Sequence, residues 1–142
     1  MTRYLYLDTS ALVKTLKHEP ETGDLLDFLP STEAPLVTSQ LTITELHRAA
    51  RWYALPAIEV ERRLEEIDLV PVTRAQLLTA GLLPDPPAPP WTRLRTFDAI
   101  HLAAAVQVEC GAFLTYDANQ SRAAASAGLK LVCPGRPDDW FR

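Results

Sequence analysis

The feature that most constrains this chain is a short apolar run near the N-terminus that ends at a carboxylate. Tyr4 to Leu7 are aromatic or aliphatic without interruption, and Asp8 follows at once. Such a run predicts a strand that is buried on both faces, as in a parallel sheet. Ser10 is expected to cap the helix that begins with Ala11. A strand that turns straight into a helix places Asp8 at the carboxyl edge of a sheet, where open α/β folds bind their ligands.

The rest of the chain alternates between short apolar runs and helical patterns. This alternation predicts a three-layer α/β/α fold with a central, mostly parallel, five-stranded sheet. The run that contains Pro71 is expected at an edge of the sheet, because proline cannot donate a ladder hydrogen bond. One domain is expected to span residues 1–142. The expected strands are residues 4–7, 36–38, 69–72, 112–116 and 130–133. The expected helices are residues 10–17, 20–29, 42–54, a helix starting at Pro56, 73–83, 97–110 and 118–127.

Several helix ends carry local signals. Thr73 and Gln76 have the spacing of a capping box, in which each side chain bonds to the backbone of the other residue. Thr96 is expected to cap the apolar helix that follows it, and Gly111 to close that helix. Charges at i,i+4 spacing predict ion pairs on a solvated helix face, namely Glu59 with Arg63 and Arg62 with Glu66.

Composition places the chain among ordinary globular proteins, with 47% hydrophobic and 23% charged residues. It shows neither a membrane-length apolar run nor the pattern of a signal peptide, so a cytoplasmic protein without membrane association is expected. Cys110 and Cys133 are expected to be buried thiols. The net charge of −4 argues against a nucleic-acid ligand unless four acids hold a metal, since 14 basic and 14 acidic residues then remain. Residues 84–90 contain five of the twelve prolines and predict a stiff surface loop.

Four carboxylates stand in apolar surroundings. Asp8 and Asp117 end predicted strands, Asp98 lies in the first turn of a buried helix, and Glu45 lies within an amphipathic helix. Each alone has a structural explanation: turn or helix capping for the aspartates, and an ion pair with Arg48 for Glu45. Together they are expected to meet at one edge of the sheet, where their charges would repel each other without compensation. Oxygen donors of this kind suit Mg²⁺ or Mn²⁺.

At this point the sequence resembles a known family. The segments 7–14, 44–46, 97–105 and 114–117 look like the four signatures of the PIN domain, in the form found in VapC toxins of bacterial toxin–antitoxin pairs. The resemblance extends from Tyr4 to Val132. It implies a Mg²⁺- or Mn²⁺-dependent endoribonuclease, a homodimer, and a cognate antitoxin that covers the active site.

The resemblance also implies roles for particular residues. Asp8, Glu45, Asp98 and Asp117 would hold the metal, and RNA cleavage would leave a 3′-hydroxyl and a 5′-phosphate. By their chemistry, Ser10 and Thr115 are candidates to orient a carboxylate or to contact a phosphate, with a helix cap for Ser10 and an ordinary strand position for Thr115 as the alternatives. His101 is either a packed core residue or a partner of the Asp98 carboxylate. The candidates for RNA phosphate contacts are Arg48, Arg51, Arg93, Arg95 and Arg122, each of which has solvated surface charge as its alternative.

Other functions fit the residues less well. A haloacid dehalogenase-like phosphotransferase also begins with an aspartate after a strand, but the residue two positions after Asp8 is Ser10 and not a second aspartate. A receiver domain lacks its paired acids here for the same reason. The remaining alternative is a catalytically silent PIN fold that only binds RNA or a protein, and the presence of all four acids argues against it.

Overall fold

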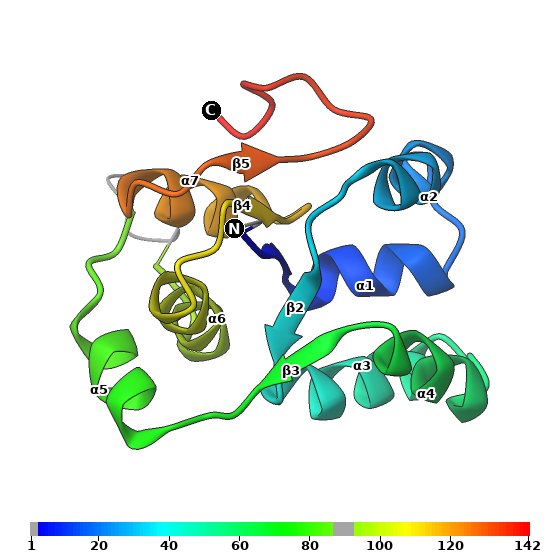
Figure 1. Cartoon of the computed structure of the whole chain (residues 1–142), viewed down its shortest axis with the longest axis horizontal. Helices are drawn as coiled ribbons and strands as arrows, with labels where there is room; N and C mark the ends of the chain where they lie inside the picture. Colours follow the sequence, from blue (N-terminus) through cyan, green and yellow to red (C-terminus); the bar gives the residue numbers. More distant parts are fainter. Residues whose placement is uncertain (1–2, 87–92) are drawn as a thin grey trace.

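One parallel sheet organises the chain in the computed structural model, which describes residues 3–86 and 93–142. Its strands are β1 (Leu5–Leu7), β2 (Leu36–Ser39), β3 (Asp68–Val70), β4 (Ala112–Leu114) and β5 (Leu131–Val132). Their order is β3-β2-β1-β4-β5, so the strand that leads to Asp8 is the central one (Figure 1). Every neighbouring pair is parallel, which confirms the predicted five-stranded sheet.

Helices cover both faces of this sheet (Figure 1). Leu5 and Leu7 pack against the first four helices, whereas Tyr6 packs on the opposite face among residues of the last two helices. Because successive side chains of a strand point to opposite faces, β1 must be apolar at every position, as its sequence indicates. The helices of the described ranges are α1 (Thr9–Leu16), α2 (Thr22–Ser31), α3 (Leu41–Trp52), α4 (Ala57–Glu65), α5 (Arg74–Leu82), α6 (Thr96–Gln107) and α7 (Ala118–Ser126).

The start of α1 differs from the prediction. The helix begins at Thr9, and its N-cap is Asp8, whose side chain accepts a hydrogen bond from the Ala11 backbone N–H. Ser10 therefore lies inside the first turn and is not the cap. The reason is that Asp8 has the extended backbone that an N-cap needs, while the Ser10 hydroxyl donates to the Asp8 carboxylate.

The ends of α6 also differ. Thr96 is its first helical residue, and Arg95 occupies the N-cap position without a side-chain cap bond. At the other end Glu109, and not Gly111, has the left-handed backbone conformation, with φ of 51°. Gly111 is needed for a different reason: a Cβ there would lie 2.9 Å from the Cβ of Arg3, beside the entry to β1.

The remaining local signals are partly confirmed. Thr73 accepts a hydrogen bond from the Gln76 backbone N–H, as predicted, but the Gln76 amide turns away and donates to Gln107. Only half of the expected capping box therefore forms. The ion pairs of α4 form at i,i+3 spacing instead of i,i+4, between Arg62 and Glu59 and between Arg63 and Glu66.

Two loop predictions and the thiol prediction can be compared with the structure. Pro71 directly follows β3, and β3 is an edge strand, as expected. Cys110 and Cys133 are free thiols, the first buried and the second half-buried. Residues 84–86 form no helix or strand, and the rest of the proline-rich segment, 87–90, lies outside the described residues. Across 3–86 and 93–142, no helix combines the length and apolar character of a membrane span. The cytoplasmic location stays a prediction.

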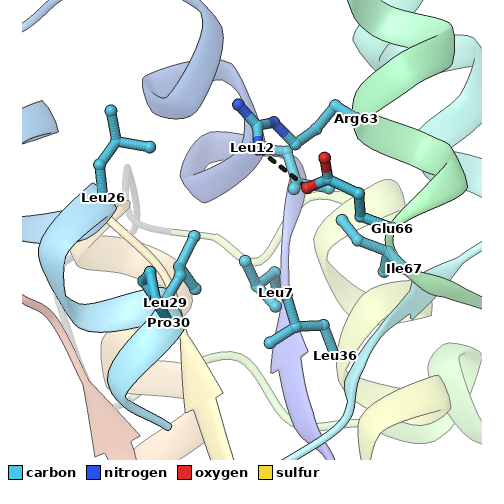
Figure 2. A pocket seen from close by; sticks show the side chains of 9 residues that line it. All are labelled: Leu7, Leu12, Leu26, Leu29, Pro30, Leu36, Arg63, Glu66 and Ile67. Atoms are coloured by element: carbon cyan, nitrogen blue, oxygen red, sulfur yellow. Dashed lines mark hydrogen bonds and ion pairs between the residues drawn. The ribbon is translucent and has the colours of Figure 1, made fainter.

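An apolar pocket of about 320 Å³ opens between α2 and α4, with Leu7 of β1 at its base (Figure 2). At its rim Arg63 donates a hydrogen bond to Glu66 at 3.1 Å, so the single acid of the lining is already paired. As far as the described residues show, none of the four candidate acids lines this pocket. The lining consists of Leu7, Leu12, Leu26, Leu29, Pro30, Leu36, Arg63, Glu66 and Ile67.

Candidate active site

Asp8 lies just beyond the central strand, and its side chain is buried, with 4% of the residue exposed. Its Oδ1 accepts hydrogen bonds from the Ser10 hydroxyl at 2.6 Å and from the Ala11 backbone N–H at 3.1 Å. Its Oδ2 accepts one from the Thr115 hydroxyl. Burial raises the pKa of Asp8 above its usual value, and these hydrogen bonds oppose that shift because they stabilise the anion. The carboxylate is thus held by neutral donors on both oxygens.

The two hydroxyls that hold Asp8 also connect β1 to the segment after β4. Ser10 Oγ accepts a hydrogen bond from the Tyr116 backbone N–H at 3.0 Å, and Thr115 Oγ1 accepts one from the Asp117 backbone N–H at 3.1 Å. Each hydroxyl therefore donates to Asp8 and accepts from the chain that leads to Asp117. The structure brings Ser10 and Thr115 to the carboxylate that they were expected to orient, while their part in catalysis stays a prediction.

Glu45 reaches the same edge of the sheet from α3. Its Oε1 accepts a hydrogen bond from the Thr9 hydroxyl at 2.8 Å and lies 2.6 Å from His101 Nε2. Because an ionised carboxylate can only accept, Nε2 is the donor in the second bond. The ion pair with Arg48 that would explain an isolated acid is absent from the described residues. The partners of Glu45 lie 36 and 56 residues away in the sequence, on α1 and α6.

His101 is a core histidine that also takes part in the candidate site. It is 1% exposed, and its Nδ1 lies 2.8 Å from the Tyr6 hydroxyl. Burial raises the pKa of Tyr6, and the charge of Asp8 raises it further, so the phenol keeps its proton and can donate it to Nδ1. No bond to the Asp98 carboxylate is found within the described ranges; the acid that His101 contacts is Glu45. Tyr6 and Thr9 were not predicted as site residues.

Asp98 and Asp117 lie at the starts of α6 and α7. The pKa of the half-buried Asp98 is raised to about 6, first by burial and then by the negative charges of Asp117, Asp8 and Glu45. Asp117 is the N-cap of α7, and its Oδ1 accepts a hydrogen bond from the Gln120 backbone N–H at 2.8 Å. The buried Gln120 amide donates to the Asp98 backbone carbonyl at 3.0 Å. Gln120 therefore fixes the first turns of the two helices relative to each other, although nothing in the sequence singled it out.

The four carboxylates match a hard divalent cation in donor chemistry. Their only possible ligand atoms are carboxylate oxygens, which such cations prefer. No lysine or arginine of the described ranges forms an ion pair with any of the four. As the side chains lie, however, no group of three or more His, Cys, Asp or Glu residues in 3–86 and 93–142 is arranged to hold an ion. The residues therefore fit Mg²⁺ or Mn²⁺ in chemistry and charge, but not in side-chain geometry, and the metal site stays a proposal.

Comparison with known proteins assigns the family. The family model described as "PIN domain" matches residues 5–126, which include all four candidate acids. The chain belongs to the PIN domain family. Ribonuclease VapC35 of Mycobacterium tuberculosis is 39% identical to this PIN domain over 141 residues, covering 93% of this chain and 98% of that protein.

Solved structures share the fold of this PIN domain. The crystal structure of Mycobacterium tuberculosis VapC20, described as a sarcin-ricin loop cleaving toxin, has a TM-score of 0.71 at 17% identity and covers 92% of this chain and 99% of that one. A toxin–antitoxin complex from Klebsiella pneumoniae has a TM-score of 0.70 at 17% identity, covering 94% and 99%. At these identities the likeness concerns the fold, and it confirms the predicted PIN-like architecture.

The candidate arginines of this PIN domain divide into two kinds. Arg122 is half-buried and donates to the Phe141 carbonyl at 2.8 Å and to Asn119 at 3.0 Å, so it holds the C-terminal segment against α7. A phosphate contact is not needed to explain it. The other four candidates are exposed: Arg48 and Arg51 on α3, and Arg93 and Arg95 before α6.

Proposed function

We propose that this PIN domain is a Mg²⁺- or Mn²⁺-dependent endoribonuclease that acts as the toxin of a type II toxin–antitoxin pair. The observation that carries the proposal is geometric: neighbouring hydroxyls at the start of α1 hold two of the acids, Ser10 donating to Asp8 and Thr9 to Glu45. Burial, together with the charges of Asp117, Asp8 and Glu45, raises the pKa of Asp98 to about 6. Four acids from distant parts of the chain thus act on one another at the carboxyl edge of the sheet. The name of a relative that is 39% identical, Ribonuclease VapC35, supports the same activity.

In the proposed site Asp8, Glu45, Asp98 and Asp117 would hold the ion directly or through water. If bound there, such an ion would supply a water molecule of lowered pKa as the nucleophile and positive charge to neutralise the phosphate. Cleavage is expected to leave a 3′-hydroxyl and a 5′-phosphate.

The chain's own residues would keep these carboxylates in place. Ser10 and Thr115 hold the two oxygens of Asp8 by hydrogen bonds, which fixes the plane of that carboxylate. Thr9 and His101 both bond to one oxygen of Glu45, which leaves the other oxygen available to a ligand. Such supporting hydrogen bonds commonly set the orientation and basicity of metal ligands.

The same proposal includes partners. A cognate antitoxin would bind this chain and cover the active site, an inference supported by the likeness to a toxin–antitoxin complex. We also infer a homodimer, which follows from the resemblance to VapC toxins and not from a contact in the chain. The cytoplasmic location stays a prediction of the sequence.

Incubation of the purified, antitoxin-free chain with total RNA tests the activity. Mg²⁺ or Mn²⁺ should produce discrete fragments with 5′-phosphate ends, and a chelator should prevent them. Intact RNA at saturating concentrations of both ions, together with measurable RNA binding, would instead identify the chain as a binding module without catalysis.

A further inference from the structure

An exposed aromatic residue and two arginines share a surface on the last turns of α3. Arg48, Arg51 and Trp52 line a surface depression of about 350 Å³, and we call these three residues the α3 patch. Trp52 is 84% exposed. Neither arginine forms an ion pair with any residue that the structure describes. The patch therefore carries two uncompensated positive charges beside an indole ring in water.

Helix stability accounts for only part of this arrangement. A basic residue in the last turn, such as Arg51, interacts favourably with the negative end of a helix. That argument gives no role to Trp52, because a large aromatic side chain gains most when it is buried. Arginine beside an exposed aromatic ring is, by contrast, the combination with which proteins bind single-stranded nucleic acids: the ring stacks on a base, and the cations neutralise phosphates.

The α3 patch is continuous with the candidate active site. Glu45 and Trp52 are seven residues apart on the same helix, which places them on one face and about 10 Å apart along its axis. Arg48 lies between them, one turn beyond Glu45. A distance of about 10 Å corresponds to roughly three nucleotides of a stacked strand. A strand that passes the carboxylates can therefore reach Trp52 without leaving α3.

We propose that the α3 patch binds the single-stranded part of the RNA substrate, with one base stacked on Trp52 and phosphates bound by Arg48 and Arg51. The inference rests on the proposed ribonuclease function. Charge complementarity favours this occupant over a second copy of the chain, because a two-fold contact through the patch would set the arginines of one copy against those of the other.

Binding can be measured apart from cleavage by placing all variants in an Asp8→Asn background. A labelled single-stranded RNA of roughly ten nucleotides, followed by fluorescence anisotropy, suits the size of such sites. Trp52→Ala should raise the dissociation constant about tenfold, whereas Trp52→Phe, which keeps a ring, should stay within about twofold. Arg48→Gln combined with Arg51→Gln should lower the slope of log Kd against log salt by about 1.4, since each lost phosphate contact contributes about 0.7 on a single strand.

Two control variants match these changes elsewhere on the surface. Leu82 on α5 is also 84% exposed, so Leu82→Ala removes an equally exposed apolar side chain. Arg74→Gln removes one exposed positive charge from the same helix. Neither control should change the dissociation constant beyond about twofold. A larger effect of the α3 variants would then come from base stacking and phosphate contacts, and not from the loss of any exposed apolar side chain or positive charge.

The outcomes distinguish this inference from the proposed function. If the unmodified chain cleaves RNA but Trp52→Ala binds RNA as tightly as its parent, the proposed role of the α3 patch is overturned and the proposed ribonuclease activity is supported. If the chain does not cleave RNA, yet binding depends on Trp52 and both arginines, the role of the patch is supported and the ribonuclease activity is overturned. If Trp52→Ala instead converts a dimer to a monomer in sedimentation, the patch is a contact between two copies, and the inference is overturned.

Discussion

His101 and Glu45 share a hydrogen bond of 2.6 Å although 56 residues separate them in the sequence. The histidine is 1% exposed, and its other ring nitrogen lies 2.8 Å from the hydroxyl of Tyr6 in the central strand. The carboxylate, by contrast, remains 22% exposed. A buried ring thus reaches outward from the core and holds an acid at the rim of the candidate site, so that the position of Glu45 depends on the packing of α6 against β1.

Replacing His101 by alanine is therefore expected to weaken Mn²⁺ binding and slow RNA cleavage by about tenfold or more, because Glu45 loses one of the two donors that orient it. His101→Gln should lose less Mn²⁺ affinity and less activity, since the glutamine amide N–H can also donate to the Glu45 carboxylate. The alanine variant should in addition be less stable by about 1–3 kcal/mol, because the Tyr6 hydroxyl is left buried without this partner. Calorimetric titration of Mn²⁺ into the folded variants measures the effect. Equal Mn²⁺ affinity of His101→Ala and the parent would show that the ring only fills the core.

Asp8→Asn is expected to abolish RNA cleavage while leaving the chain folded. Asparagine keeps an oxygen for Ser10 and Ala11, but removes the negative charge that the proposed site needs. Cleavage assays, with circular dichroism as the check on folding, measure the outcome. Asp27→Asn is a matched control, because Asp27 is an exposed carboxylate on α2. An Asp8→Asn chain that cut RNA at the parental rate would exclude Asp8 from the site.

Expression of the chain alone should arrest the growth of a bacterial host, whereas the Asp8→Asn form should not. The reason is that an unopposed ribonuclease degrades RNA that growth requires, and the proposed antitoxin is missing. Colony counts after induction measure the effect, and immunoblots check that both forms accumulate equally. Normal growth with abundant, soluble parental protein would contradict the toxin assignment. The nuclease activity would still be tested separately, by the cleavage assay with purified protein.

Asp98 links pH to stability. Its folded pKa of about 6 lies above the ordinary 3.8, so the folded chain binds the proton more tightly than the unfolded chain does. The contribution of Asp98 to the free energy of unfolding is thus most favourable below pH 3.8 and is lost as the pH rises through about 6. The difference between these pKa values corresponds to about 3 kcal/mol, which solvent screening of a half-buried side chain reduces to about 1–2 kcal/mol.

Asp98→Asn should consequently stabilise the chain in chelator at pH 7 by about 1–2 kcal/mol and have little effect at pH 3.5. In saturating Mn²⁺ the order should reverse, because the parent gains about 2.7 kcal/mol at a hundredfold excess over its dissociation constant. Thermal melts of both chains under the three conditions decide the matter. A variant that melts lower in chelator, or that gains as much from Mn²⁺ as the parent, would show Asp98 to be a helix-dipole residue.

A second charge cluster, near the end of α1, should control acid stability. The Lys14 ammonium is 5% exposed and donates to Glu21 at 2.8 Å, and Arg136 donates to the same acid at 2.8 Å. These hydrogen bonds, Lys14 first, lower the pKa of Glu21 from 4.5 to about 2. Stability from this group is therefore complete above pH 4.5 and is lost as the pH falls towards 2.

Glu21→Gln should accordingly reduce the free energy of unfolding by about 2 kcal/mol at pH 7, and by much less at pH 2. Urea titrations at both pH values measure the difference. Glu33→Gln, which changes an exposed glutamate, is the control and should have little effect at either pH. A loss that is the same at both pH values would mean that Glu21 contributes through packing and not through its charge.

The parallel sheet and the edge that carries its acids could be predicted from the sequence because both follow from local patterns, whereas the strand order came only from the structure. An apolar run predicts a strand buried on both faces, and parallel pairing then fixes the end at which its carboxylate emerges. The observed register, with Leu7 opposite Leu114, places Asp8 and Asp117 at the same edge. Asp98 joins them because helices that pack on a parallel sheet begin at that edge. Capping was less predictable: Ser10 and Thr96 have suitable side chains, but the backbone makes Asp8 and Arg95 the N-caps.

By itself, then, the sequence determined which side chains are buried and which end of each strand carries an acid, since periodicity encodes burial. Tertiary structure alone decided the partners of those side chains. Glu45 bonds to Thr9 and His101 and not to Arg48, although Arg48 is only one helical turn away. A hydrogen bond between distant residues needs particular rotamers and a particular approach of two elements, and neither leaves a periodic signal along the chain. The bridge from Arg136 to Glu21, across 115 residues, arises in the same way.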